Sequence, residues 1–397
     1  MTVLSNRISR LAISQTLAMS QQSRELKAKG HDVINLSVGE PDFFTPDVVK
    51  DAAKKAIDNN ISFYSPVPGY ADLLTAITNK LKRDNNLEYT PSQIVVSAGA
   101  KHSLANIMLS MINEGDEVII PAPYWVSYIE QVKLADGTPV IVDTLQSNEY
   151  KITPEQLENA ITDKTKLFML CSPSNPTGSI YSADELAALA KVLEKYPHVY
   201  IISDEIYEYI NFVGEHASIA VHKSIFDRVI IVNGVSKGYA MTGWRIGYIA
   251  APQIIASACS KLQGQMTSGA CSVAQMAALE AIQNPNSTSK EMIDTFKRRR
   301  DMVFELLNDI EGFKTNLPKG AFYFLPDVSY YFGKTINGVK INDAQDLCMY
   351  ILNNAYVAIV PGEAFGEPNT VRLSYAASDE SLKEAFRRIK EVLSKVE

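Results

Sequence analysis

One lysine stands in a segment whose composition suits covalent chemistry with a carbonyl compound. Lys237 follows the apolar run 229–232 and lies among small and apolar residues in the segment 233–245. Such surroundings lower the pKa of an amine and make it nucleophilic toward carbonyl carbon. Ser236 and Arg245 are close in sequence, and both could bind a phosphate, the arginine in a bidentate manner. An exposed lysine is the ordinary alternative, and the dense glycine, serine, methionine and tryptophan surroundings argue against it.

A carboxylate and a phenol follow a second apolar run. Asp204 comes directly after residues 199–203, and Tyr207 is three residues further on. A carboxylate at the end of a buried strand is costly unless a cation or a hydrogen-bond donor meets it. If a helical turn follows, both side chains project to one side and could bind one ligand. A helix cap with an exposed neighbour is the alternative, and these two residues alone do not decide the matter.

Two more turns follow apolar runs. The segment 172–178, Ser-Pro-Ser-Asn-Pro-Thr-Gly, is a rigid turn that can aim the Asn175 amide and can contain a cis X-Pro bond. Gly99 and Ala100, after the run 93–97, form a small-residue turn that opens a helix, where backbone N–H groups and the helix dipole favour a phosphate. Ordinary turn chemistry is the alternative for both. Together the four loops suggest a phosphorylated aldehyde cofactor at the edge of a sheet.

The elements that would position these loops alternate between strands and helices. Near-continuous apolar runs predict strands that are covered on both faces, and the runs are separated by helical patterns. The alternation predicts an α/β fold with a large, doubly wound and mainly parallel sheet. In such folds ligands collect beyond the carboxyl ends of the strands, where all four loops lie. The predicted strands are 93–97, 117–120, 139–142, 166–171, 199–203, 229–232 and 245–250.

The last hundred residues have a different pattern. Short strand-like runs at 320–328 and 371–376 are mixed with helices, which predicts a smaller α/β domain. The first forty residues contain no predicted sheet of their own. We therefore predict an N-terminal segment, 1–45, that joins the small domain, a large cofactor-binding domain over 46–285, and a small domain over 286–397.

Composition excludes several classes of protein. The 397 residues are 46% hydrophobic and 21% charged, as in ordinary globular proteins. With 38 Lys and Arg against 45 Asp and Glu, the net charge is −7, which gives no general attraction to nucleic acid. The one basic run, 297–300, is predicted to be a solvated helix face.

The cysteines and the apolar stretches indicate in which cellular compartment the protein works. The four cysteines form no CxxC pair and no Cys/His cluster with zinc spacing, so we predict reduced thiols and no metal. No stretch of 18 apolar residues occurs, and the first residues lack the apolar core of a secretory signal. We therefore predict a cytoplasmic protein without membrane contact.

The whole set of motifs resembles class I pyridoxal-phosphate aminotransferases, and most closely the bacterial aspartate aminotransferases that carry a lysine after the glycine turn. The resemblance runs in order from about residue 5 to 395, so it is far more specific than any single motif. The segments that carry it are SVGEPDF (37–43), YSPVPGY (64–70), YWVSY (124–128), SPSNPTG (172–178), SDEIYE (203–208), NGVSKGYAMTGWRIGY (233–248), GAFYFLPD (320–327) and VRLSYA (371–376).

The resemblance implies a role for each residue that would contact the ring of pyridoxal 5'-phosphate. Lys237 corresponds to the Schiff-base lysine, which also moves a proton between substrate and cofactor. Asp204 corresponds to the partner of the pyridine nitrogen, which a buried carboxylate keeps protonated. Tyr207 and Asn175 correspond to donors to the phenolic oxygen of the cofactor, and Trp125 to the residue that stacks on its ring.

The resemblance also implies how the phosphate is bound. Backbone groups at Gly99–Ala100 would hold it together with Ser236 and Arg245. Many relatives have a serine ligand at the position of Gly234, and here Ser236 would compensate for it unless its hydroxyl points away. Tyr64 corresponds to a residue that reaches the phosphate across a dimer interface, which implies a homodimer with two shared active sites.

For the substrate, the resemblance implies two anion contacts. Arg372 corresponds to the bidentate clamp on the α-carboxylate, helped by Asn175 and the Gly39 backbone, with Trp125 also against the substrate. Lys101 corresponds to a cation that binds the distal carboxylate of aspartate or glutamate, because a neutral lining would leave that charge unpaired. A phosphate-adjacent or solvated lysine is the alternative for Lys101.

The activity implied is that of an aspartate aminotransferase. In a ping-pong reaction L-aspartate would give its amino group to the cofactor and leave as oxaloacetate, and 2-oxoglutarate would take that group and leave as L-glutamate. Amination of prephenate stays open, and β-elimination from sulfur amino acids is disfavoured by the predicted dicarboxylate cation. A ligand-sensing regulator on this fold would be expected to carry a DNA-binding domain, whereas the resemblance begins almost at Met1.

Overall fold

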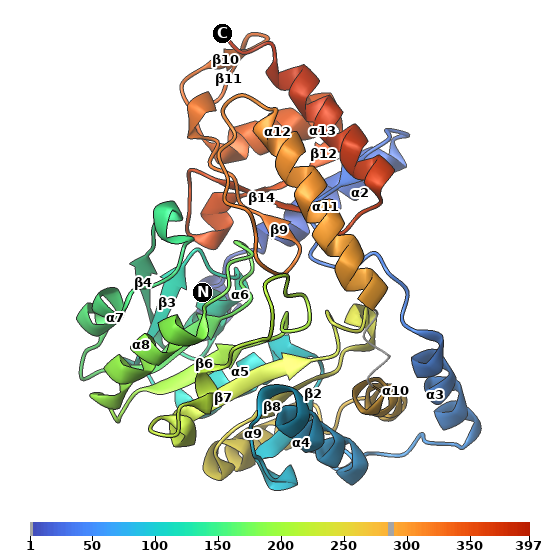
Figure 1. Ribbon diagram of the computed structural model, residues 1–397, viewed down its shortest axis with the longest axis vertical. Helices are drawn as coiled ribbons and strands as arrows, with labels where there is room; N and C mark the ends of the chain where they lie inside the picture. Colours follow the sequence, from blue (N-terminus) through green and yellow to red (C-terminus); the bar gives the residue numbers. More distant parts are fainter. Residues whose placement is uncertain (1–2, 285–289) are drawn as a thin grey trace.

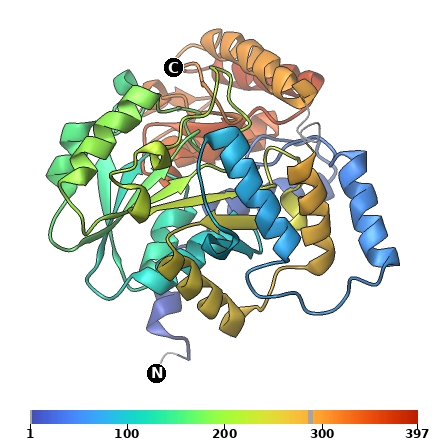
Figure 2. The same cartoon turned by 60° about the horizontal axis from the view of Figure 1, so that its bottom comes forward.

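The computed structural model describes residues 3–284 and 290–397. Figure 1 shows a large body built on a sheet, with a second group of helices and short strands above it that contains the C-terminus. The N-terminal segment extends away from the body, as Figure 2 shows from a second direction. Within the described ranges no helix is both long and apolar enough to cross a membrane. All four cysteines are free thiols.

The predicted doubly wound, mainly parallel sheet is confirmed. Its strands lie in the order β2-β8-β7-β6-β5-β3-β4, and every neighbouring pair is parallel except the two made by β8. All seven predicted strands are present, and no predicted end is wrong by more than two residues. They are β2 (Ile94–Ser97), β3 (Glu117–Ala122), β4 (Thr138–Asp143), β5 (Thr165–Cys171), β6 (Tyr200–Asp204), β7 (Val229–Gly234) and β8 (Gly247–Ala250).

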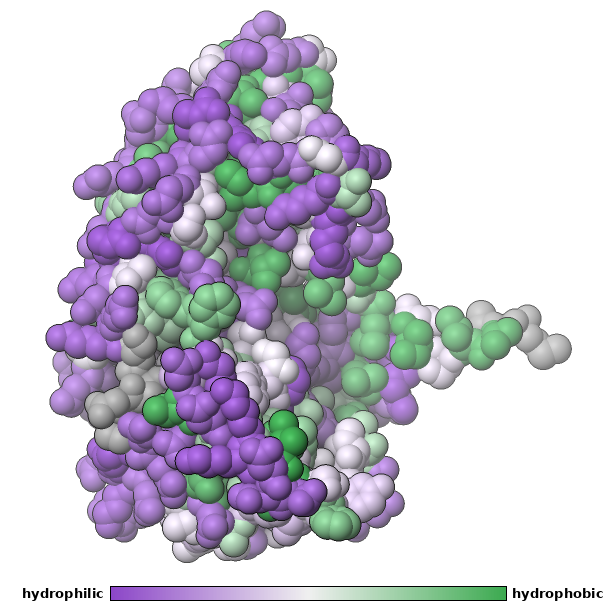
Figure 3. All heavy atoms as spheres, turned by 90° about the vertical axis from the view of Figure 1, so that its right-hand side faces the viewer, coloured by the Kyte–Doolittle hydropathy of each residue, from purple (hydrophilic) through white to green (hydrophobic). Residues whose placement is uncertain are grey.

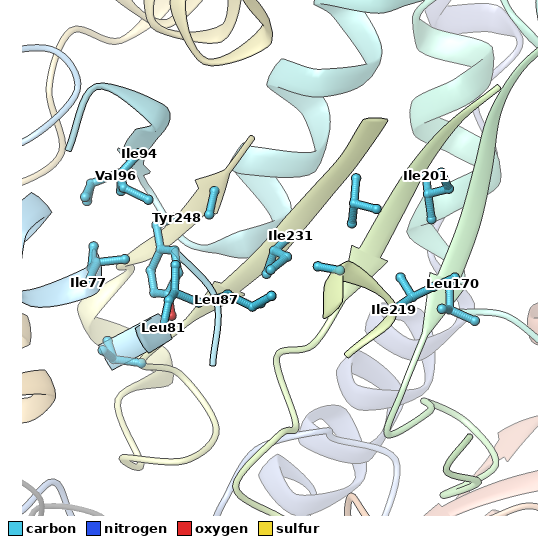
Figure 4. Close-up of a cluster of buried hydrophobic side chains, with 14 of the residues drawn as sticks. Ile77, Leu81, Leu87, Ile94, Val96, Leu170, Ile201, Ile219, Ile231 and Tyr248 are labelled. Carbon is cyan, nitrogen blue, oxygen red and sulfur yellow. The ribbon is translucent and has the colours of Figure 1, made fainter. Parts of the chain in front are cut away.

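Helices cover both faces of this sheet because most of its strands are apolar on both sides. On one face, Ile77 and Leu81 pack with Val96 and Tyr248 in a core that continues across the sheet (Figure 4). The helices that contribute to it are α3 (Asp47–Asp58), α4 (Ala71–Asn85), α7 (Pro154–Ala160), α8 (Ala183–Glu194) and α10 (Ser272–Gln283). A core on the other face is covered by α5 (Ala100–Met111), α6 (Ser127–Leu134) and α9 (Gln253–Met266).

A separate core joins the two ends of the chain. Met19, Val33 and Leu36 pack there with side chains of the C-terminal helices. The N-terminal segment also contributes a strand, β1, which pairs in parallel with β12. The sequence predicted no sheet in this segment, because two residues are too few for a periodic signal. These elements are α1 (Asn6–Ser9), α2 (Gln15–Ala28), β1 (Ile34–Asn35), α11 (Lys290–Asn308), β9 (Tyr323–Phe324), β10 (Thr335–Ile336), β11 (Val339–Lys340), α12 (Ala344–Ala355), β12 (Val357–Ala358), β13 (Val360–Pro361), β14 (Val371–Ser374) and α13 (Asp379–Leu393).

The division into an N-terminal segment, a large domain and a small domain stays a prediction. The packing of N-terminal residues into the C-terminal core agrees with it. The predicted boundary between residues 285 and 286 lies outside the described residues.

The prediction of a solvated face for the basic run on α11 is wrong for two of its residues. Arg299 and Arg300 are buried. Arg299 forms ion pairs with Asp42 at 2.7 Å and with Asp379 at 3.1 Å, so it ties the N-terminal segment to α13. The charge pattern along one helix does not reveal partners that are distant in sequence, and that is why the run resembled a solvent-facing surface.

Candidate active site

A cavity of about 430 Å³ opens beside the carboxyl ends of the sheet strands. Its walls come from the strand ends of the large body, from the N-terminal segment and from β14. Eleven of the thirteen predicted site residues line it, and Gly99 and Tyr64 do not. The eleven are Gly39, Ala100, Lys101, Trp125, Asn175, Asp204, Tyr207, Ser236, Lys237, Arg245 and Arg372.

Asp204 is the last residue of β6 and is buried at the floor of the cavity. Burial raises the pKa of this carboxyl to about 6, although two hydrogen bonds oppose the shift. Tyr128 donates one of them to Oδ2 at 2.6 Å, and the backbone N–H of Ile206 donates the other to Oδ1 at 3.2 Å. No cation pairs with Asp204 within the described residues, so the site holds a carboxylate that can accept a positive partner.

Tyr207 lies in the turn that follows β6, as predicted, and its side chain faces the same cavity. Its hydroxyl shares a hydrogen bond of 2.8 Å with that of Tyr323 on β9. Burial raises the pKa of the Tyr207 phenol well above its usual value, so it acts as a neutral hydrogen-bonding group.

Lys237 has no carboxylate partner among the residues that the structure describes. Its Nζ donates a hydrogen bond to the carbonyl oxygen of Gly39 at 2.6 Å. Burial, with help from Arg245 and Arg372, lowers its pKa to about 8 in spite of the opposing charges of Glu40 and Asp204. About one amine in ten is therefore unprotonated at pH 7, far more than for an ordinary lysine, and the free amine is the form that attacks a carbonyl.

The turn at Gly99–Ala100 begins helix α5 and contacts Arg245. Gly99 has a φ of +84°, and a Cβ there would lie 2.3 Å from Arg245 Nη2, so a side chain at this position would displace the guanidinium. Ala100, Ser236 and Arg245 all line the cavity. A helix N-terminus beside an arginine and a serine hydroxyl is an anion site of the kind that binds phosphate.

The structure leaves no room for a side chain at Gly234. Gly234 pairs with Gly247 across the antiparallel strands β7 and β8. A Cβ at Gly234 would lie 2.7 Å from the carbonyl oxygen of Ile246, so no serine fits there without movement of the backbone. Ser236 is then the serine of this segment that reaches the cavity.

Arg372 is a buried cation that faces the cavity without a carboxylate partner in the described part of the chain. Its guanidinium lies between the rings of Tyr323 and Phe365, 4.7 Å from each centroid. Nη1 donates to Asn175 Oδ1 at 3.1 Å and Nη2 donates to the carbonyl oxygen of Ser37 at 2.6 Å, while Nε has no hydrogen-bond partner. Such a charge is costly to bury, and an incoming carboxylate would compensate it.

Asn175 is buried in a turn that contains two cis bonds, Ser172–Pro173 and Asn175–Pro176. The prediction that this turn could contain a cis X-Pro bond is therefore confirmed.

Trp125 and Lys101 stand on one wall of the cavity. The Lys101 ammonium lies 4.9 Å from the centroid of the Trp125 ring. Lys101 still reaches solvent, while partial burial and the like charge of Arg245 lower its pKa. The tryptophan face thus carries a cation at the mouth of the cavity.

Tyr64 is apart from the cavity and is 96% exposed. Its loop is held by hydrogen bonds from buried glutamines. Gln275 accepts from the backbone N–H of Tyr70 and donates to Ser65, and Gln263 donates to the carbonyl oxygen of Val67. The braced loop therefore presents Tyr64 outward.

Behind β6, a second set of charged side chains is buried. Oxygen and nitrogen atoms of Glu205, Glu208 and His216 lie within 4.8 Å of one another. Lys80 pairs with Glu208, Asn85 donates to Glu208 at 3.1 Å, and His216 lies 3.1 Å from Glu205. Protein groups thus already compensate these carboxylates.

Sequence reasoning missed two tyrosines of the site. Tyr128 donates to Asp204, and Tyr323 contacts both Tyr207 and Arg372. Both belong to motifs that carried the resemblance, at 124–128 and 320–327. A tyrosine in an apolar motif looks like core packing, and nothing in the sequence says which residue its hydroxyl meets.

Comparison with known proteins decides the family. The family model for class I and II aminotransferases matches residues 31–389. The chain belongs to this family. An aspartate/prephenate aminotransferase of Cereibacter sphaeroides is 47% identical over 392 residues, with 98% of both chains covered. An aspartate aminotransferase of Bacillus subtilis is 45% identical over 394 residues, with 99% of both covered.

Solved structures agree with this assignment. The aspartate aminotransferase from Rhizobium meliloti has a TM-score of 0.97 and 40% identity, and the match covers 100% of both chains. The enzyme from Thermus thermophilus, solved with maleate, has a TM-score of 0.93 and 38% identity, and 99% of this chain and 100% of that one are covered.

This aminotransferase is therefore a pyridoxal-phosphate-dependent enzyme. The cavity fits the cofactor: it joins a nucleophilic amine, a buried carboxylate without a cation, and a helix N-terminus with an arginine for the phosphate. When bound, the cofactor supplies the electron sink that stabilises negative charge at the substrate Cα.

Proposed function

We propose that this aminotransferase transfers the amino group of L-aspartate to 2-oxoglutarate. The observation that carries the proposal is the surplus of unpaired cations around one cavity. Arg372 is buried there without a carboxylate partner among the residues that the structure describes, and Lys101 lines the cavity beside the ring of Trp125. A dicarboxylic amino acid supplies one anion for each, whereas a neutral side chain would leave Lys101 without an anion. Both proposed partners, aspartate and 2-oxoglutarate, are dicarboxylates, as is the maleate named with the Thermus thermophilus enzyme.

In this proposal Arg372 binds the α-carboxylate of the substrate through Nη1 and Nη2, and Asn175 helps to hold this carboxylate. The guanidinium is already fixed by two aromatic faces and two hydrogen bonds, so little entropy is lost when substrate binds. The backbone N–H of Gly39, which donates no hydrogen bond among the described residues, is a further donor. Lys101 binds the distal carboxylate of the substrate, and Trp125 lines the cavity between Lys101 and Arg372.

The remaining site residues act on the cofactor. Lys237 would hold the cofactor through Nζ, and once substrate has taken its place the freed amine would accept the proton from the substrate Cα and pass it on to the cofactor. Asp204 would hold the ring nitrogen protonated, while Tyr207 and Asn175 would donate to the phenolic oxygen. Trp125 stacks on the ring. The turn at Gly99–Ala100 binds the phosphate together with Ser236 and Arg245.

We also propose a homodimer in which Tyr64 of each chain completes the other chain's phosphate site. Tyr64 and Phe63 are 96% and 81% exposed on a loop that is otherwise firmly held. Figure 3 shows the N-terminal segment projecting from the body with apolar side chains on it, and Val3, Ile8 and Ile13 are at least half exposed. A second copy is the partner that would cover both. The cytoplasmic location stays a prediction.

Prephenate is a second acceptor to test, because relatives that match nearly this whole chain are named aspartate/prephenate aminotransferases. Initial rates with L-aspartate as donor should be compared for 2-oxoglutarate, prephenate and pyruvate. We expect 2-oxoglutarate to give the highest kcat/KM, and Arg372→Leu to abolish turnover with every acceptor. Equal rates with pyruvate and 2-oxoglutarate would contradict the proposed substrate class.

Mixing two defective chains tests the shared site. A Lys237→Ala chain keeps Tyr64, and a Tyr64→Ala chain keeps Lys237, so a mixed dimer would contain one complete site. We expect the mixture, after subunit exchange, to be more active than either parent. Activity no greater than the average of the two parents would contradict a shared site.

A further inference from the structure

A buried hydrogen bond connects Asp204 to helix α6 on the sheet face opposite α4 and α8. Tyr128 Oη donates to Asp204 Oδ2 at 2.6 Å. Tyr128 is 2% exposed and Asp204 is 4% exposed. The geometry of the hydrogen bond is that of a short, charge-assisted bond, which is among the strong hydrogen bonds in proteins.

Among the groups that face Asp204, Tyr128 makes the largest contribution to stabilising the negative charge of its carboxylate. Glu205, the next residue, repels that charge, and Lys237 attracts it from across the cavity. Cys171, on the neighbouring strand β5, is a half-buried neutral thiol whose pKa burial raises to about 12. The backbone N–H of Ile206 donates to Asp204 at 3.2 Å, which makes it the longer of the two hydrogen bonds that Asp204 accepts within the described residues.

The phenol is suited to this task because it does not compete for the proton. Burial raises the pKa of Tyr128 well above its usual value, so the group stays a neutral donor wherever the enzyme works. A histidine or a lysine in its place would add a charge and its own titration to the floor of the site.

Tyr128 is also joined to the residue that is proposed to stack on the cofactor ring. It lies three residues after Trp125, in the first turn of α6, and the two rings meet edge to face at 5.4 Å and 84°. One short segment of chain therefore fixes both the wall above the ring and the carboxylate at its edge.

We propose that Tyr128 is a positioning residue that holds Asp204 as an oriented anion, so that the shared proton stays on the pyridine nitrogen of the cofactor. This inference rests on the proposed role of Asp204. A donor to the carboxylate stabilises the anionic form and thereby favours the pair of carboxylate and protonated ring. Loss of the donor makes the carboxylate the better base, which moves the proton toward Asp204 and weakens the electron sink.

Tyr128→Phe removes one hydroxyl and keeps the ring that packs on Trp125. The variant should be stripped of cofactor, reloaded with pyridoxal phosphate labelled with ¹⁵N in the ring, and compared with the parent enzyme by ¹⁵N NMR. We expect the ring-nitrogen resonance to move toward that of neutral pyridine. We expect kcat to fall about 10- to 100-fold, the usual range for a lost hydrogen bond to a charged group, with KM for the amino donor nearly unchanged.

Tyr375→Phe is the matched control, because it removes the buried hydroxyl that donates to the carbonyl oxygen of Ala321 at 3.0 Å, outside the cavity. It should leave the ¹⁵N resonance unchanged. 3-Fluorotyrosine at position 128 keeps the shape of the side chain and is a stronger hydrogen-bond donor. We expect this variant to keep the ring nitrogen protonated and kcat near that of the parent. The comparison does not depend on whether Tyr128→Phe folds stably.

Asp204→Asn separates the two possible failures. If this variant keeps the parent's ¹⁵N resonance and kcat, the proposed role of Asp204 is wrong. If Asp204→Asn shifts the resonance while Tyr128→Phe leaves both the resonance and kcat unchanged, the role of Asp204 stands and the inference about Tyr128 is overturned.

Discussion

The choice of a dicarboxylic substrate depends most on Lys101, and Lys101→Met tests it. Methionine keeps a long apolar side chain against Trp125 while it removes the charge. The ammonium now lies 4.9 Å from the tryptophan ring centroid and has no carboxylate partner among the described residues. We expect kcat/KM for L-aspartate to fall while that for L-alanine stays nearly constant, because alanine has no distal carboxylate.

The size of the loss can be bounded from the surroundings of the charge. Two unit charges 4 Å apart attract by about 1 kcal/mol in water and about 4 kcal/mol at the effective dielectric constant near a protein surface. Lys101 still reaches solvent, yet partial burial lowers its pKa, so it lies between these limits. A value of about 2–3 kcal/mol corresponds to a loss of roughly 30- to 150-fold in kcat/KM for aspartate.

The assay is the steady-state rate with each donor at low and high salt. Lys340→Met is the control, since Lys340 is an exposed lysine on β11 that does not line the cavity. The control should leave both donors unaffected, and salt should weaken the preference of the parent enzyme for aspartate. An equal loss of kcat/KM with aspartate and with alanine in Lys101→Met would refute the reasoning, because alanine has no distal carboxylate for the Lys101 charge to bind.

Two further predictions follow from buried cations. The rate at which cofactor-free protein takes up pyridoxal phosphate should rise with pH, reach half its maximum near pH 8 and level off about one unit higher, because the pKa of Lys237 in the folded protein is lowered to about 8 and only the free amine attacks. Stopped-flow absorbance measures this rate, and a rate that does not change between about pH 6 and pH 9 would contradict the prediction. Arg299→Ala should lower the free energy of unfolding by about 3 kcal/mol, because it removes a buried cation, leaves the partly buried Asp42 without its partner and leaves Asp379 with Arg298 alone. Arg298→Ala, which removes an exposed partner of the same Asp379, should cost less than about 1 kcal/mol in urea unfolding. Equal losses of unfolding free energy in the two variants would refute the prediction that the buried arginine contributes more than the exposed one.

The central sheet could be predicted from the sequence because its signal is local. Continuous apolar runs of the right length, separated by helical patterns, located all seven strands to within two residues. The rule that ligands collect at the carboxyl ends of such strands then selected loops that do meet at one cavity. Asp204 and Lys237 were found in this way without any knowledge of their neighbours.

The parts that could not be predicted depend on contacts between distant residues. Arg299 looks solvated on its own helix and is buried only because Asp42 and Asp379 come from the two ends of the chain. Tyr128 looks like a core residue until its hydroxyl is seen on Asp204. Strand β1 is too short to show a period and exists because β12 offers it a partner.

The measurement that tests the account most directly is the absorption spectrum of the purified enzyme during separate half-reactions. The account predicts a band of lysine-bound cofactor that L-aspartate alone converts to the amino form and that 2-oxoglutarate then restores. Lys237→Ala should lack the band of the lysine-bound form. A parent enzyme whose bound cofactor ignores L-aspartate would contradict the proposed substrate, and one that fails to bind pyridoxal phosphate after reconstitution would contradict the assignment of the site itself.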